Sequence, residues 1–376
     1  MVTSDSSRAT AALLVAGMFA GPVAGGALVL LAKPFGGRLG IPGAVVGYIA
    51  LTALLCACGA ALFGPRLALA PRRAGLFVLV SGAALLVAAS VTHVGVFTAA
   101  VLIAALAAGP VLGFGRVSAV ARGGRALAGW HLAQWGGIGV AAGVAALCDT
   151  APATALRVTG IACLVLGSIL LLPESAAAQA VSIRRGTDGE RTPSGWSRGL
   201  VAGYAGVGFA VGGTVLPGLH LLLFRWNALD AQQCVLLLLA VAPAIVVAAL
   251  PAVEPDAIPL ALIAAAGGAL LIATAPGRVT LTLGLAVTLG AAACGARALD
   301  AAAGSGVSPA RAVHTGLLSV LAALAGLGFV ALIGASAGTG TGVTLLSLPV
   351  LLTALMWVRA PRTFAPARLA PEGNTP

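Results

Sequence analysis

Long apolar stretches, separated by charged residues or Pro/Gly turns, dominate this chain and restrict what it can fold into. A helix needs about 20 apolar residues to cross a hydrocarbon layer about 30 Å thick, because each residue rises about 1.5 Å. Transmembrane barrel strands would be about 10 residues long and alternate in polarity, and this sequence shows no such alternation. The sequence therefore predicts an all-α polytopic membrane protein with twelve spans, at 11–32, 41–63, 74–91, 95–115, 128–147, 153–172, 199–224, 231–250, 257–275, 279–299, 309–334 and 341–358.

The scarcity of charge excludes several classes of protein. Of the 376 residues, 60% are hydrophobic and 8% are charged, whereas soluble domains carry about 25% charged residues. This excludes a soluble enzyme, a disordered chain and a nucleic-acid-binding domain, although the net charge of +11 would otherwise suggest nucleic acid. We expect the lipid bilayer and a small-molecule substrate to be the partners of the chain. The sequence does not indicate an oligomeric state.

The basic residues predict the orientation in the membrane. With an inside N-terminus, sixteen of the 21 basic residues fall in cytoplasmic segments, as the positive-inside rule requires. Both termini are then cytoplasmic. A polar, basic stretch divides the chain into a six-helix half at 1–173, a linker at 174–198, a second six-helix half at 199–358 and a tail at 359–376. The preference for Arg over Lys, with high Ala and Gly, indicates a bacterial source and hence the bacterial plasma membrane.

Two motifs carry a resemblance to a known family. The segment 64–73, after the second predicted span, resembles the signature loop Gly-x-x-x-Asp-Arg-x-Gly-Arg-Arg of the major facilitator superfamily through Gly64, Arg72 and Arg73, although three other signature positions differ. Leu172-Pro173-Glu174 resembles the Leu-Pro-Glu ending common at the sixth span in that family. The resemblance implies an alternating-access permease with two six-helix halves. It also implies that Gly64, Arg72 and Arg73 act in conformational exchange.

The ionisable residues depart from what proton-coupled members of that family carry. All ten acidic residues fall in predicted loops or at span ends, and the fourth span, Val101 to Gly115, contains no Arg. We therefore predict no membrane-embedded carboxylate. Coupling would then use histidine, whose ordinary pKa of about 6.5 suits proton exchange, or transport would be uncoupled. We expect Arg297 and Asp300, three residues apart, to form an ion pair that anchors the end of the tenth span; a gate is the alternative.

Candidate substrate-binding residues lie in the fifth and seventh spans. His131, Gln134 and Trp135 form part of two adjacent polar and aromatic stripes on one helix, which could line a cavity for an apolar or aromatic molecule; an interfacial aromatic belt is the alternative. Tyr204 and His220 are 16 residues apart, roughly 24 Å along a helix, and would share a site only if the helix breaks between them. A histidine that merely packs is an equal alternative for His220.

Motifs for catalysis, cofactors or metals are missing from the sequence. It contains no phosphate-binding loop and no metalloprotease or nucleophile motif, and we interpret the six cysteines as buried small hydrophobic residues. We expect no enzymatic activity, no cofactor and no metal. Small-residue pairs such as Gly21/Gly25 and Gly139/Gly143 predict close helix packing.

The favoured interpretation is a permease that exports a hydrophobic or amphipathic small molecule, because an apolar interior with few fixed charges does not suit a strongly charged one. The alternative is a non-transporting membrane scaffold or accessory subunit on a transporter-like fold. The degenerate signature loop and the predicted lack of an embedded acid motivate that alternative.

Overall fold

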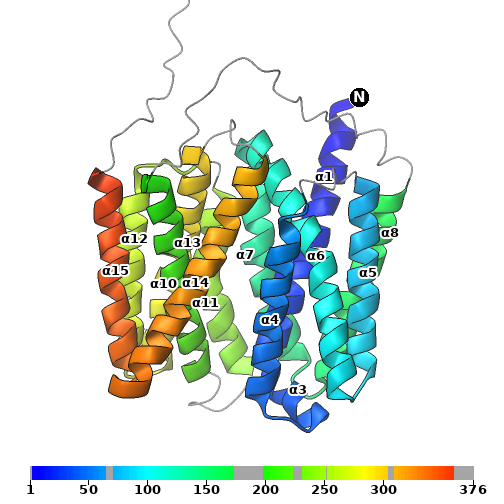
Figure 1. The fold of residues 1–376 in the computed structure, drawn as a ribbon, viewed down its shortest axis with the longest axis horizontal. Coiled ribbons are helices and arrows are strands. Elements are labelled where there is room, and N and C mark those ends of the chain that lie inside the picture. Colours follow the sequence, from blue (N-terminus) through cyan, green and yellow to red (C-terminus); the bar gives the residue numbers. More distant parts are fainter. Residues whose placement is uncertain are drawn as a thin grey trace, which may run out of the picture.

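The computed structural model of the chain is a bundle of roughly parallel and antiparallel helices (Figure 1). It describes residues 2–64, 71–172, 198–222, 231–250, 252–303 and 309–359, and within these ranges all regular secondary structure is helical. The helices before residue 172, called the first group below, are α1 (Val2–Met18), the π-helical turn η1 (Phe19–Val23), α2 (Ala24–Leu30), α3 (Ala32–Leu39), α4 (Gly43–Ala61), α5 (Pro71–Ser90), α6 (Val94–Arg122), α7 (Gly124–Leu147) and α8 (Pro152–Leu171).

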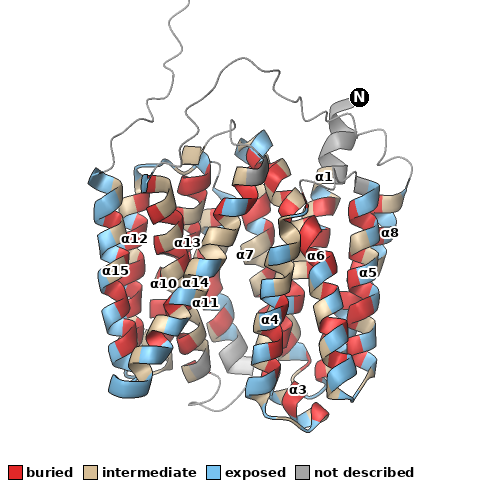
Figure 2. Cartoon of the chain, in the orientation of Figure 1, coloured by how far each residue is buried: buried red, intermediate tan, exposed pale blue. Residues whose placement is uncertain are grey.

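The helices after residue 198 are called the second group. They are α10 (Arg198–His220), α11 (Ala231–Ala249), α12 (Ala257–Ala273), α13 (Arg278–Ala303), α14 (Pro309–Ala337) and α15 (Thr339–Arg359). Figure 2 shows buried residues concentrated on the helix faces that meet other helices, with exposed residues on the outer surface.

Each of the twelve predicted stretches is occupied by helix. Within the described residues, nine helices are long and apolar enough to cross a membrane, and α11 and α12 contain shorter apolar stretches, Val235–Ala249 and Ala257–Ala273. The all-helical fold class is therefore confirmed, whereas the count of twelve spans, their direction and the division into two six-helix halves stay predictions. The short helix α3 was not predicted. Residues 174–197 of the predicted linker, the tail beyond residue 359 and positions 65–70 lie outside the described residues.

Close helix packing depends on glycines other than those we singled out. A Cβ placed on Gly82 would lie 2.8 Å from the carbonyl oxygen of Gly160, and one on Gly160 would lie 2.9 Å from that of Gly82. Gly75 and Gly167, two turns away, repeat this reciprocal contact at 2.9 and 3.0 Å. These two pairs let the backbones of α5 and α8 touch, which is how small residues hold helices together in lipid.

The glycine pairs taken from the sequence were poor choices. Gly25 and Gly143 face open space, while Gly21 and Gly139 approach only the side chains of Leu112 and Ile245. A small-x-x-x-small pattern marks a face on which close approach is possible, but the neighbouring helix decides whether it occurs.

The two groups meet at two seams. On one, α7 packs against α11; on the other, the beginning of α14 packs against α6 and α4. Figure 1 shows α14 crossing the bundle obliquely, so that it approaches α4 near the end where α14 begins and diverges from it toward the other end. The second seam is therefore confined to the end of the bundle that carries the N-terminus.

Candidate functional site

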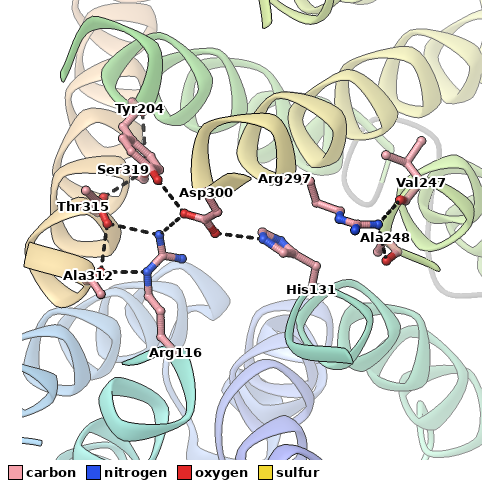
Figure 3. A network of polar contacts seen from close by, with 10 residues as sticks. All are labelled: Arg116, His131, Tyr204, Val247, Ala248, Arg297, Asp300, Ala312, Thr315 and Ser319. Atoms are coloured by element: carbon pink, nitrogen blue, oxygen red, sulfur yellow. Dashed lines mark hydrogen bonds and ion pairs between the residues drawn. The ribbon is translucent and has the colours of Figure 1, made fainter. Parts of the chain in front are cut away.

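A buried carboxylate, Asp300, occupies the centre of the contact between the two groups (Figure 3). It lies near the end of α13, and its side chain is 1% exposed. Oδ1 accepts hydrogen bonds from Arg116 Nη2 at 2.7 Å and from Tyr204 Oη at 2.5 Å, and Oδ2 lies 2.9 Å from His131 Nε2. Arg116 and His131 belong to the first group, whereas Tyr204 and Asp300 belong to the second. We call these four residues, with Thr315, the Asp300 network.

Arg116 also binds α14. Its Nε donates to the carbonyl oxygen of Ala312 at 2.8 Å, and its Nη2 donates to Thr315 Oγ1 at 3.2 Å. The Arg116 side chain is 14% exposed, so one guanidinium group joins the end of α6 to both α13 and α14 in a largely dry environment. Charge-assisted hydrogen bonds of this kind are roughly twice as strong as neutral ones.

The bond to His131 fixes one detail of the protonation of the site. An ionised carboxylate can only accept hydrogen bonds, so the Nε2 of His131 must carry a proton when Asp300 is charged. The imidazole is then either the neutral Nε2–H form or the doubly protonated cation. Asp300 is thus placed between a permanent cation and a group that can gain a second proton.

Glycines next to the polar residues bring these helices close enough for the network to form. A Cβ on Gly203, the neighbour of Tyr204, would lie 2.5 Å from Leu299 Cδ2, and a Cβ on Gly316 would lie 3.3 Å from Arg116 Cδ. Gly115 likewise lets the Trp130 ring pack closely on α6, since a Cβ placed at position 115 would lie 2.9 Å from that ring. Polar residues directly beside glycine are the sequence signal that could have predicted this site.

A glycine turn sets α6 and α7 in register. Gly123 and Gly124 have φ values of 60° and 44°, a region that residues with a Cβ rarely adopt. The chain therefore reverses within two residues. Arg116 and His131, which stand at similar distances on either side of the turn, arrive at the same end of the bundle.

Arg297 does not pair with Asp300, so the predicted ion pair is wrong. Although it is only three residues from Asp300, Arg297 is directed away from it (Figure 3). Its Nη1 donates to the carbonyl oxygens of Val247 and Ala248, at 3.1 and 2.9 Å, and to that of Leu250. These carbonyls lie at the end of α11, where backbone donors run out, although Val247 O also accepts from the backbone N–H of Leu250 at 3.2 Å. Arg297 is 3% exposed and acts as a cap that ties α11 to α13.

Two further expectations from the sequence are overturned by the Asp300 network. The predicted absence of an embedded carboxylate is wrong, because α13 continues to Ala303 and neighbouring helices enclose Asp300. The fourth span was also expected to lack Arg, but α6 continues to Arg122 and contains the partly buried Arg116. In both cases the predicted span ended one residue before the ionisable group.

The candidate binding residues lie in different environments. The structure brings His131 and Tyr204 together through Asp300, whereas Trp130 is buried against α6 rather than facing a lipid interface. Trp135 packs on apolar residues of α10, α11 and α13. Gln134 has a buried Nε2 with no hydrogen-bond partner among the described residues.

His220 is the last residue of α10, far from Tyr204 along the helix. The helix does not break at Pro217, so the two do not share a site. In the loop assigned to conformational exchange, Gly64 is buried, and a Cβ there would lie 2.9 Å from the carbonyl oxygen of Pro110 on α6. Arg72 and Arg73 are exposed in the first turn of α5. They belong to α5, which contributes no residue to the Asp300 network as defined above.

The geometry of this site can hold the two groups of helices together at one end. Removing one partner from a buried ion pair typically costs about 3–5 kcal/mol. An apolar cluster at the same end adds to the contact, with buried Val117 and Val120 from α6, Leu127 and Trp130 from α7, and Ala312 and Val313 from α14. The described residues contain no group of three or more His, Cys, Asp or Glu that could hold a metal ion.

Several solved structures of membrane transporters have a similar fold. The chain resembles the human organic anion transporter MFSD10 (TETRAN) with a TM-score of 0.71 and 19% identity, covering 94% of this chain and 99% of that one. It also resembles the proton:xylose symporter XylE, with a TM-score of 0.65, 13% identity and 96% coverage of both chains. A POT family transporter in complex with a thioalcohol-conjugated peptide gives a TM-score of 0.67 at 13% identity, covering 93% of this chain and 95% of that one.

These similarities show that the chain has the fold of the major facilitator superfamily. No protein-family model matches the sequence, and no curated protein is similar to it.

Proposed function

We propose that the chain is an alternating-access membrane transporter and that the Asp300 network closes one end of its substrate path. The observation that carries this proposal is the buried contact of Asp300 with Arg116 and His131, which joins the two groups of helices at one end of the bundle. A transporter of this fold must part its halves at one end and join them at the other. Polar contacts between the two groups of helices suit this opening and closing better than an apolar core, because a change of charge can break them.

We further propose that the substrate is a hydrophobic or amphipathic small molecule, exported across the bacterial plasma membrane. The support is the composition of the described helices: apart from Ser and Thr residues, the buried polar or charged residues there are His131, Arg297 and Asp300. The alternative of a non-transporting scaffold is less well supported than before. One argument for it was the predicted lack of an embedded acid, and Asp300 is buried between the helices. Transport, rather than catalysis, is the activity that this geometry supports.

The position of Asp300 supports proton coupling. When the seam opens, Asp300 keeps Tyr204 but loses Arg116 and His131, which belong to the other group. A buried carboxylate without a counter-charge is costly and tends to take up a proton. The groups that face it are Arg116 from α6, His131 from α7, Tyr204 from α10 and Thr315 from α14, and Arg116 is the only permanent charge among them. We infer that opening this end accompanies protonation of Asp300.

The test is flux in proteoliposomes. Purified protein should move Nile red, a neutral amphipathic dye, and an imposed pH gradient should drive the dye against its own gradient. Asp300→Asn, which mimics a permanently neutral side chain, should abolish pH-driven accumulation while leaving downhill flux. Asp256→Asn changes an exposed acid and is the matched control. If folded protein moves no member of a panel of amphipathic dyes in either direction, the transporter proposal is wrong.

A further inference from the structure

Helix α7 is long but less apolar than its neighbours. It has 24 residues, enough to cross a hydrocarbon layer about 30 Å thick, yet it is not among the nine helices that are also apolar enough. Two of the side chains that lower its hydropathy are His131 and Gln134. His131 belongs to the Asp300 network, whereas Gln134 has no part in that network.

The Nε2 of Gln134 is a hydrogen-bond donor without an acceptor. The atom is buried and has no partner among the described residues. An unsatisfied buried donor destabilises a folded protein, and an apolar side chain of the same length would avoid that cost. Buried polar atoms nearly always have a partner in native proteins, so this exception indicates a partner that comes from outside the chain.

The position of Gln134 around α7 gives the direction of its side chain. With 3.6 residues per turn, each residue is rotated by about 100° from the one before it. Gln134 therefore lies between two pairs of residues. Trp130 and Gly137 stand on one side of it, and His131 and Ile138 stand on the other.

These two pairs face different groups of helices. Trp130 packs on α6 and Gly137 packs on α1 and η1, all in the first group. His131 contacts α13, and Ile138 packs on a cluster from α11 and α13, both in the second group. Gln134 consequently points between the two groups, into the interior of the bundle.

The depth of Gln134 matches that of a substrate site. It stands ten residues after Gly124, the first residue of α7, or about 15 Å along the helix, which is half of the hydrocarbon thickness. In transporters built from two halves, the substrate binds near this midplane, between the halves.

A space inside the bundle borders Gln134. The residue as a whole is half-buried, and the outer side of α7 is marked instead by the exposed Leu132 and Val140. What remains exposed of Gln134 thus faces inward. The last torsion of a glutamine side chain is soft, so a small rotation turns Nε2 toward that space.

We propose that Gln134 anchors the substrate and selects a neutral amphipathic molecule with an oxygen acceptor, such as a ketone, an ester or an ether. This inference rests on the proposed function and specifies its substrate class. A single uncharged donor does not compensate for burying a full charge, and the nearby Arg116 is bound to Asp300. The apolar Ile138, one turn further along α7, suits the body of such a molecule.

The first test compares two ligands that differ by one carbonyl group. Fluorenone and fluorene share a ring system, but only fluorenone has an oxygen acceptor. Binding is measured as the rise in the thermal unfolding midpoint of the purified chain in detergent, over a range of ligand concentrations. Fluorenone should bind the unaltered protein about tenfold more tightly than fluorene, which corresponds to about 1.4 kcal/mol. Gln134→Met should bring this ratio to about one, and Leu132→Met, at an exposed position of the same helix, should leave it at about ten.

The midpoints without ligand separate binding from a structural role. Gln134→Met and Gln134→Leu remove an unsatisfied donor, so both variants should unfold at the same temperature as the unaltered protein or at a higher one. A fall in the midpoint of both variants would show that Gln134 is bonded within the protein, and the assignment would be wrong. It would be equally wrong if Gln134→Met kept the tenfold ratio, or if fluorenone did not stabilise the unaltered protein.

The second test is Nile red flux, since this dye carries a ring carbonyl. Gln134→Met should raise the KM about tenfold and leave the maximal rate unchanged, as expected when an interaction made equally in the bound and transition states is lost. An unchanged KM would contradict the anchor. If the preference for fluorenone depends on Gln134 but no dye is moved, the binding site stands and the proposed transport function is wrong.

Discussion

Arg297 satisfies the end of a helix with a side chain from a different helix. Its guanidinium group donates to carbonyl oxygens at the end of α11, and its Nε has no hydrogen-bond partner among the described residues. A carbonyl left without a partner in an apolar environment costs about 1–3 kcal/mol. The residue is thus a structural cap, in spite of its position one turn from the Asp300 network.

Arg297→Met should destabilise the protein by about 1–3 kcal/mol, because it removes the donors and keeps most of the side-chain volume. The measurement is the thermal unfolding midpoint in detergent. Arg157→Met, which alters an exposed arginine of α8, should leave the midpoint within error. Equal midpoints for the two variants would show that the cap contributes nothing.

Cys148 provides a residue-scale test that depends on pH. It follows α7 and is buried, and burial raises the pKa of its thiol above the ordinary value, with the neighbouring charge of Asp149 acting in the same direction. The thiolate is the reactive form, so a raised pKa means slow alkylation near neutral pH and a rate that still climbs above pH 9.

In a variant that retains only Cys148, we expect alkylation at pH 7.5 to be slower than in the same protein unfolded in detergent. Asp149→Asn should lower the pKa of the thiol and speed the reaction. A rate that does not change with Asp149→Asn would contradict the assigned role of that charge.

Sequence reasoning at the residue scale found His131, Tyr204 and Asp300 but not their connection. Each stands on a different helix, and the polar bonds that join them span from 96 to 169 residues of sequence. A helical spacing rule reports only neighbours on one helix, which is why it paired Asp300 with Arg297. Arg116 was missed because the predicted span stopped at residue 115, and burial by other helices cannot be derived from local composition.

At the scale of elements, the positions of the helices were predictable because the membrane sets their length and the charged residues mark their ends. How the helices pair was not. The reciprocal contact of Gly82 with Gly160 depends on the order of α5 and α8 in space, which hydropathy does not contain. The short helix α3 was missed because eight residues are too few for a periodic pattern.

Gly82→Ala should destabilise the α5–α8 pair by about 1–3 kcal/mol, the usual cost of overpacking, because its Cβ would lie 2.8 Å from the carbonyl oxygen of Gly160 and 2.9 Å from Cys163 Cβ. Gly47→Ala on α4 is the control, since a Cβ there meets nothing within 4 Å. The thermal midpoint should fall for Gly82→Ala and stay level or rise for Gly47→Ala. Similar shifts for the two variants would exclude close packing as the cause.

For the whole molecule, the orientation in the membrane decides which compartment the Asp300 network faces. The turn at Gly123 lies at the same end as the network, and the distribution of basic residues predicts that this turn is cytoplasmic. Alkaline phosphatase fused after Gly123 should be inactive, because this enzyme needs the oxidising periplasm, and the same fusion after Pro276 should be active. The reverse pattern would place the Asp300 network on the outer side.

The Asp300 network also has a statistical consequence. If parting it costs about 3 kcal/mol, the low end for a buried charge pair, then about 1 molecule in 150 has this end open at any instant, since each 1.4 kcal/mol is a factor of ten. Single-molecule recordings would show long closed dwells interrupted by short openings. A ligand that enters from this end would bind with an apparent affinity reduced by the same factor, so its measured dissociation constant would report the strength of the closure as much as the fit of its site.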